Sequence, residues 1–206
     1  MEVFWIPHLS ILVLLHQTTS ARSTTKVIGV LGGSVTFRSH NPDRNVALWS
    51  FGDDPIVTVV FRDSPRLIFF EDKFEARFAI SKNGHSLIIS QLRMEDARTY
   101  YLKINRKTST FILRVFRELA EPMVTCKAQN CSDGSCSSSL HCSVPGDGFG
   151  EISYTWRVGN QPLAEGPVLL VNESLLDKLE LLTCRVQNPV SSRSVNVTNP
   201  GVLCAG

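Results

Sequence analysis

The chain has 206 residues, which is enough for one large domain or for two domains of about a hundred residues each. Its formal net charge of +2 is too small to indicate a nucleic-acid-binding protein. The charge is nevertheless uneven, because Lys26–Glu118 contains fifteen Lys/Arg and ten Asp/Glu, whereas Leu119–Gly206 contains five and eight. The basic half is either an ordinary solvated surface or a surface that meets a partner.

Residues 1–21 are predicted to be a secretory signal peptide. An apolar run, Ile11–Leu15, is followed by small and polar residues, with cleavage expected near Ser20 or Ala21. Later in the sequence no run approaches the roughly twenty apolar residues that a membrane helix requires, and no glycolipid-anchor signal is found. We therefore expect an extracellular chain, secreted as written and held at the cell surface in any longer, anchored form.

Residues 22–117 are predicted to form an all-β, variable-type immunoglobulin-like domain. The sequence shows short alternating apolar runs with polar breaks and no convincing helical period. Their order is typical of strands B, C, C′, E, F and G of a two-sheet sandwich. In chain order the runs are "GGSVTFRS", "VALWSF", "IVTVVF", "HSLIISQL", "TYYLKIN" and "TFILRVF".

The central disulfide of such a domain is missing from this sequence. In "EDARTYYLKI", Leu102 stands where strand F should carry a cysteine, and Ser39 stands at the matching position of strand B. A bridge of that loop length would contribute about 4 kcal/mol, whereas burial of Leu102 against Trp49 returns about 2–3 kcal/mol. We expect apolar packing to offset most of the loss.

Three further residues are expected to hold the same region as scaffold, without contacting a ligand. The Tyr100 hydroxyl should bond back to the chain just upstream, and Arg77 should pair with Asp96 across the bottom of the sandwich. An exposed pair contributes little free energy, so its main effect would be to fix the loop between strands E and F.

The side chains on the other parity of strands C, F and G are candidates for a ligand-binding face. They combine an aromatic and two aliphatic residues with cations and amides, which is a plausible contact surface, although isolated exposed apolar residues are common. The three N-x-Ser/Thr sequons, at Asn130, Asn172 and Asn196, all lie in the second half and leave this sheet unshielded. The face comprises Leu48, Ser50, Tyr101, Lys103, Asn105, Thr110, Ile112 and Arg114.

Residues 118–206 are predicted to form a second, constant-like immunoglobulin domain. Cys142, Trp156 and Cys184 have the order and approximate spacing of the strand B cysteine, the strand C tryptophan and the strand F cysteine. Residues 116–122 join the two halves without a Gly/Ser run, so the junction should be short and fairly stiff.

All six cysteines lie in this second half, between Cys126 and Cys204, and like the sequons they suit the secretory pathway. Six cysteines allow fifteen pairings in principle. By spacing, Cys136 and Cys204 could tie the edges of the domain together. Cys126 and Cys131 would then close a small local loop.

A metal site is the alternative interpretation of residues 126–142, which include four of the cysteines and His141. The C-x₄-C-x₄-C spacing is unusual for zinc, and adjacent His and Cys cannot readily share one ion. Export also favours disulfides. We expect no metal or other cofactor, and the absence of G-x-S-x-G, H-E-x-x-H and P-loop motifs predicts neither catalysis nor a small-molecule substrate.

Taken together, these motifs resemble the ectodomain of a signalling lymphocytic activation molecule (SLAM) family receptor. The resemblance covers essentially the whole chain after the leader. It rests on the cysteine-free first domain with "VLGGSVTF", "LWSF", "SLIISQL" and "EDARTYYLKI", and on "GSCSSSLHCSV", "YTW", "EGPVLL", "LLTCRVQNPVSS" and "LCAG" in the second.

The resemblance implies a leukocyte surface protein whose first domain binds another family member, often an identical copy, on an opposing cell. Binding would use the sheet of strands G, F, C and C′, which carries the candidate face. Such contacts are modest in area and weak individually, so adhesion would depend on many copies. The resemblance also implies Cys142–Cys184 and Cys136–Cys204 bridges.

The sequence departs from the family pattern in two respects. Family receptors have a membrane helix and a tyrosine-bearing tail, and both are missing here, so intracellular adaptors are expected only for a longer form. Cys126 and Cys131 are an extra pair. The alternative function is a secreted decoy that occupies the ligand of a membrane-bound relative.

Overall fold

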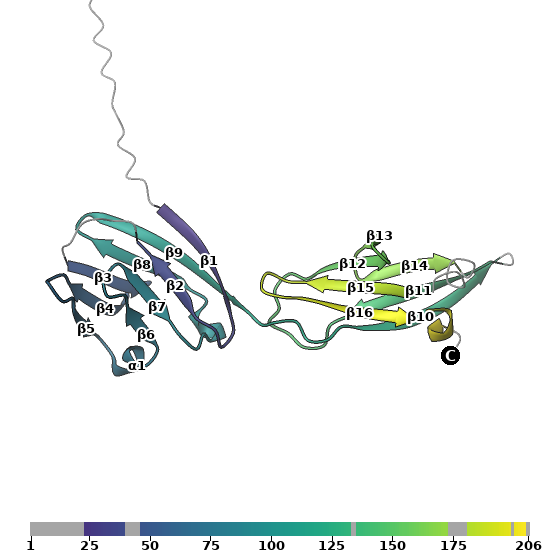
Figure 1. Cartoon of the computed structure of the whole chain (residues 1–206), viewed down its shortest axis with the longest axis horizontal. Coiled ribbons are helices and arrows are strands. Elements are labelled where there is room, and N and C mark those ends of the chain that lie inside the picture. The colour runs from purple at the N-terminus through teal and green to yellow at the C-terminus, as the bar shows by residue number, and fades with distance from the viewer. Residues whose placement is uncertain (1–22, 40–45, 133–134, 173–180, 199, 205–206) are drawn as a thin grey trace, which may run out of the picture.

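The computed structural model describes residues 23–39, 46–132, 135–172, 181–198 and 200–204. Two β-sandwiches follow one another along the long axis, each around its own hydrophobic core (Figure 1). The predicted leader lies outside the described residues. Within them, no helix has the length and apolar character needed to cross a membrane.

The first sandwich has a six-stranded sheet, β1-β9-β8-β3-β4-β5, called the front sheet below, and a three-stranded sheet, β2-β7-β6. The predicted all-β, two-domain fold is confirmed. The elements are β1 Ser23–Val30, β2 Val35–Arg38, β3 Val46–Phe51, β4 Asp54–Val60, β5 Arg66–Phe69, α1 Asp72–Glu75, β6 Phe78–Ile80, β7 Ser86–Ile89, the 3₁₀ turn η1 Met94–Asp96, β8 Thr99–Ile104 and β9 Lys107–Phe116.

Strand β1 widens the front sheet, a feature that the strand assignment from sequence did not include. It pairs in parallel with β9 along its whole length, from Ser23 opposite Ser109 to Val30 opposite Phe116. At Gly29 the backbone of β1 lies close to the core, because a Cβ added there would lie 2.5 Å from Leu92 Cδ1. Any larger residue at this point of β1 would therefore require the Leu92 side chain to move.

An aromatic cluster fills the space that a central disulfide would occupy. Phe37 has ring-centroid distances of 5.0 Å to Tyr100 and 5.1 Å to Phe111, and Trp49 lies 5.6 Å from Phe111. Leu102 lies opposite Trp49 in the sheet and is 2% exposed. Aromatic pairs of this kind contribute about 0.5–1.5 kcal/mol each beyond their buried area, so several side chains replace one covalent bond.

The bottom of the first sandwich is held by a hydrogen-bonded network around Asp96. Arg77 donates from Nη1 to Asp96 Oδ2 at 2.8 Å and from Nη2 to Oδ1 at 3.1 Å. The Arg93 backbone N–H donates to Oδ2 at 2.7 Å, and the Tyr100 hydroxyl donates to the Asp96 carbonyl oxygen at 2.9 Å. The bond to Asp96 raises the pKa of Arg77, and burial raises the pKa of Tyr100. The network joins the start of β6, η1 and β8.

The second sandwich has a three-stranded sheet, β10-β11-β14, and a four-stranded sheet, β13-β12-β15-β16. Its core begins at Leu119, and the boundary placed between residues 117 and 118 stays a prediction. The elements are β10 Met123–Ser132, β11 Ser135–Ser143, β12 Ser153–Val158, β13 Gln161–Glu165, β14 Val168–Asn172, β15 Leu181–Gln187, β16 Ser192–Thr198 and α3 Pro200–Cys204.

The disulfides correct part of the predicted pairing. Cys142 and Cys184 form the bridge between the two sheets, as expected, and both are fully buried beside Trp156. The predicted Cys136–Cys204 and Cys126–Cys131 bridges are wrong, because Cys126 is bonded to Cys204, with 5.2 Å between their Cα atoms.

The long β10–β11 hairpin explains the error. It places Cys136 opposite Cys131 in the backbone register, at the far end of the hairpin from Cys142. The side chains of Cys131 and Cys136 lie outside the described residues. Cys204 does not end a strand, since β16 stops at Thr198 and α3 then returns the chain to β10.

Peptide mapping checks the Cys126–Cys204 pairing. Digestion without reduction is expected to yield a linked peptide pair that contains these two cysteines. In a Cys126→Ser variant, Cys204 should become reactive toward an alkylating reagent, whereas the control Cys136→Ser should leave Cys204 blocked. Recovery of a Cys136–Cys204 peptide would contradict the structure.

Candidate functional site

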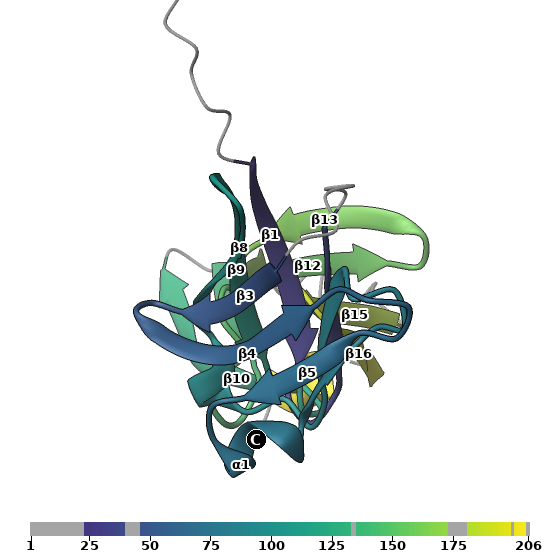
Figure 2. The same cartoon turned by 90° about the vertical axis from the view of Figure 1, so that its left-hand side faces the viewer.

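The outward side of the front sheet brings together most of the residues that the sequence assigned to a binding face. Adjacent strands place Leu48 opposite Lys103 and Tyr101 opposite Thr110. Figure 2 shows β3, β4 and β5 of this sheet side by side at the end of the molecule. The side chains of Leu48, Tyr101, Thr110 and Ile112 are half-buried, and those of Lys103 and Arg114 are exposed.

Two residues of the predicted face are not placed as expected. Ser50 is only 4% exposed, so its side chain is not available to a ligand. The β3–β4 register shifts between Trp49 and Ser50, and the Ser50 hydroxyl donates to the Gly52 carbonyl oxygen at 3.4 Å. Asn105 is exposed but lies after β8, in the turn to β9, with a φ of 55° that asparagine tolerates better than most residues.

Strands at both edges extend the outward side beyond the predicted residues. On β1, Lys26 and Ile28 lie opposite Ile112 and Arg114, and Ile28 is 53% exposed. On β5, Ile68 is 44% exposed. The alternation of Val27 and Gly29 inward with Lys26 and Ile28 outward was a usable signal for β1, but the runs assigned to strands from the sequence began only at "GGSVTFRS".

The sequons whose side chains are described lie on the second sandwich. Asn172 ends β14 and is exposed. Asn196 lies on β16, is exposed, and accepts a hydrogen bond from the Thr183 hydroxyl at 2.9 Å. The side chain of Asn130 lies outside the described residues. Glycan attachment at these positions stays a prediction.

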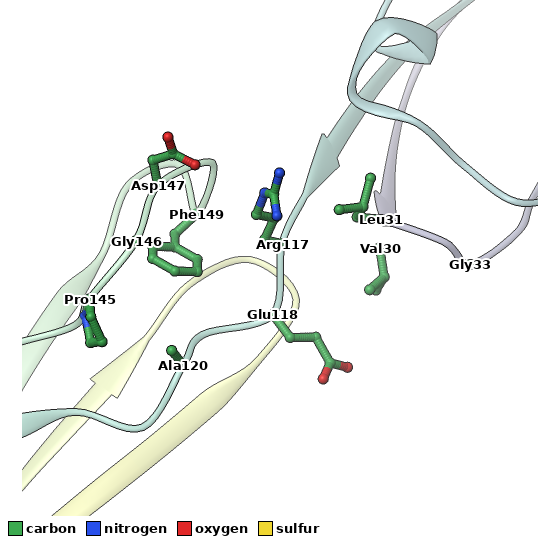
Figure 3. A pocket seen from close by; sticks show the side chains of 10 residues that line it. All are labelled: Val30, Leu31, Gly33, Arg117, Glu118, Ala120, Pro145, Gly146, Asp147 and Phe149. Carbon is green, nitrogen blue, oxygen red and sulfur yellow. The ribbon is translucent and has the colours of Figure 1, made fainter.

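A hollow of about 700 Å³ lies where the two sandwiches meet (Figure 3). Val30 and Leu31 of the first sandwich line one side, Phe149 of the second lines the other, and Arg117 lies between them. Its ten lining residues include no Ser, Cys or His, so they offer neither a Ser–His nor a Cys–His pair. Its position makes it part of the junction between the domains.

Comparison with known proteins finds relatives that match most of the chain. The Immunoglobulin V-set domain family matches residues 22–116. SLAM family member 5 of Homo sapiens is 31% identical over 225 residues, covering 96% of this chain and 61% of the relative. SLAM family member 7 of Homo sapiens is 26% identical over 212 residues, covering 96% of this chain and 63% of the relative.

The chain is similar to SLAM family members over nearly its whole length. It spans less than two thirds of the length of either of these relatives. The SLAM family consists of immunoglobulin-type receptors and adhesion molecules, which are not enzymes, and the chain is therefore not an enzyme. An extracellular or cell-surface location follows from the same relationship.

The two-sandwich architecture of this chain is shared with solved structures. The crystal structure of the CD2-binding domain of CD58 has a TM-score of 0.61 and 20% sequence identity, and covers 85% of this chain and 96% of that one. At this identity the likeness concerns the fold alone.

Proposed function

We propose that the chain is the recognition part of an immune-cell surface protein and that it binds another immunoglobulin domain through the front sheet of its first sandwich. The ligand is a second copy or a related SLAM family ectodomain. The proposal applies equally to a secreted and to an anchored form, because both would use the same face.

The observation that carries this proposal is the mixed character of the outward side of the front sheet. Leu48, Tyr101 and Ile112 form an apolar and aromatic centre, and Lys103 and Arg114 are exposed beside it. An apolar centre with a polar rim is typical of a protein-binding surface. No sequon lies in the first half of the sequence, so glycans attached to its own domain would not cover this face.

The proposal predicts that truncation of the face removes binding. Surface plasmon resonance would compare the chain with its Tyr101→Ala/Arg114→Ala variant. The captured probes are the ectodomains of human SLAM family members 5 and 7 and the chain itself. Affinity for any probe that binds should fall by about tenfold or more, because a central aromatic and an arginine are the residue types that dominate such interfaces.

The matched control is Leu170→Ala, which truncates a side chain that is 75% exposed on the second sandwich. It should leave affinity unchanged. Equal affinities of the double variant and the unmodified chain, with hydrogen exchange showing both to be folded, would rule out the front sheet.

A further inference from the structure

The outward side of the front sheet carries more exposed cations than its strands carry carboxylates. Lys26 on β1, Arg66 on β5, Lys103 on β8 and Arg114 on β9 are all exposed. Within the described part of the chain, none of the four takes part in an ion pair. The six strands contain a single carboxylate, Asp54, at the turn from β3 into β4. The outward side therefore has positive charge that the sheet itself does not neutralise.

These cations lie beside the apolar residues of the same face. In the register of the sheet, Lys103 lies opposite Leu48 and Lys26 lies opposite Ile112. Arg114 lies opposite Ile28. A ligand that covers the apolar centre would thus bring its own side chains against the cations, which lie at the rim of the contact.

A second copy of the chain is a poor match for this arrangement. A twofold face-to-face dimer uses the same patch on both subunits, so it would bring the cations of one copy toward those of the other. Like charges placed against each other disfavour association. Asp53 and Asp54 lie at the turn between β3 and β4, and Asp63 lies between β4 and β5.

We infer that the ligand of this face is a protein domain with an acidic front sheet, and that a second copy is not the ligand. This inference rests on the proposed function and specifies the partner. Opposite charge would speed the diffusional encounter and suppress self-association. Binding should weaken as salt rises, since exposed charges are screened over about 10 Å or less at physiological ionic strength.

The test uses a charge-reversed copy of the chain as an acidic probe. Lys26→Glu, Lys103→Glu and Arg114→Glu together place carboxylates around the same apolar centre. Sedimentation velocity should show the unmodified chain alone and the reversed copy alone as monomers. Their mixture should associate, and this association should weaken about tenfold when NaCl rises from about 50 to about 300 mM.

The matched control is Lys82→Glu, which reverses an exposed cation in the turn between β6 and β7, strands of the other sheet. A mixture of this variant with the unmodified chain should stay monomeric. Tyr101→Ala in the unmodified partner should abolish association with the reversed copy, which links the attraction to the proposed face.

The possible outcomes separate the inference from the proposed function. Self-association of the unmodified chain that Tyr101→Ala removes would overturn the inference and keep the function. If the mixture of the unmodified chain and the reversed copy stayed monomeric, the inference would also be overturned. The proposed function would then still be tested separately, by binding to the family ectodomains in the surface plasmon resonance experiment. Association that Tyr101→Ala does not affect would overturn both. Binding to phosphatidylserine vesicles through the same cations, without association of the mixture, would identify a membrane surface instead and overturn the inference.

Discussion

Replacing Phe37 by alanine is expected to destabilise the first sandwich by about 3–5 kcal/mol, the usual cost of removing a buried ring. Phe37 has no exposed surface, and its ring contacts Trp49, Tyr100 and Phe111 at the place where a disulfide would otherwise join the sheets. Since small domains are stable by only about 5–15 kcal/mol, this change removes a large share of the stability.

Hydrogen exchange during urea denaturation would measure this effect domain by domain. Peptides from residues 23–116 should lose protection at lower urea in Phe37→Ala, and peptides from residues 123–198 should be unchanged. The control Phe70→Ala truncates a ring that is 52% exposed, so stability should stay within about 0.5 kcal/mol of the original.

A Phe37→Leu variant separates ring contacts from buried volume. Leucine retains much of the apolar volume but loses the aromatic geometry, so its cost should be about 1–2 kcal/mol. If Phe37→Ala cost less than about 1 kcal/mol, the aromatic cluster could not be the substitute for the missing bridge.

The strands and local fixings of the first sandwich were predictable because their signals lie within a few residues. The sequence pattern identified the inward residues Trp49 and Leu102, which are both buried. Tyr100 and Asp96 are only four residues apart, and their hydrogen bond follows from the loop between η1 and β8. Short-range patterns of this kind need no knowledge of the sheet order.

Features that depend on sheet order were not predictable from one sequence. Phe37 meets Phe111 only because β2 and β9 belong to sheets that face each other. The widening of the front sheet by β1 depends on its pairing with β9. The Cys126–Cys204 bridge requires both the extended β10 and the return of α3 to that strand, which the spacing of the cysteines does not encode.

The candidate binding face shows the same difference between features that follow from local patterns and features that depend on sheet order. Its parity followed from the alternation of strands C, F and G, so Tyr101, Lys103 and Arg114 lie on the expected side. The burial of Ser50 depends on a register shift in β3. The contribution of Lys26 and Arg66 to the positive charge of this face depends on the edge strands β1 and β5, which the strand assignment from sequence did not include.

A buried amide contacts the linker between the sandwiches, that of Asn188 in the "NPVSS" segment between β15 and β16. Its Nδ2 donates to the carbonyl oxygens of Arg117 at 2.8 Å and Phe149 at 3.0 Å. Its Oδ1 accepts from the backbone N–H of Val190 at 3.2 Å and of Ser191 at 2.7 Å. At 4% exposure, these bonds are shielded from water and costly to lose.

Other contacts extend this network along the linker. The Ser191 hydroxyl donates to Asn188 Oδ1 at 2.9 Å, and its oxygen accepts from the Leu119 backbone N–H at 2.8 Å. The Arg117 N–H donates to the Gly148 carbonyl oxygen at 3.0 Å. A Cβ on Gly150 would lie 2.4 Å from Phe116 Cε1, so the last side chain of β9 packs directly on the second sandwich. The short linker is therefore attached to the second domain along most of its length.

We expect Asn188→Asp to release the linker while preserving the turn. The carboxylate can still accept from Val190 and Ser191, but it faces the carbonyl oxygens of Arg117 and Phe149 with no proton to donate. The two unpaired carbonyls and the buried charge should cost about 3 kcal/mol or more in the second sandwich. Small-angle scattering should show a broader range of interdomain distances, and the Leu119 amide should exchange faster.

The control Asn160→Asp makes the same chemical change in the exposed turn between β12 and β13. It should leave the scattering profile, the exchange rate of the Leu119 amide and the free energy of unfolding of the second sandwich unchanged. If Asn188→Asp neither broadened the scattering profile nor accelerated exchange at Leu119, the amide would not be the group that holds the linker. Because the proposed recognition face on the first sandwich would be oriented through this linker, loss of the amide should also weaken binding between opposed surfaces while leaving the affinity of single molecules in solution unchanged.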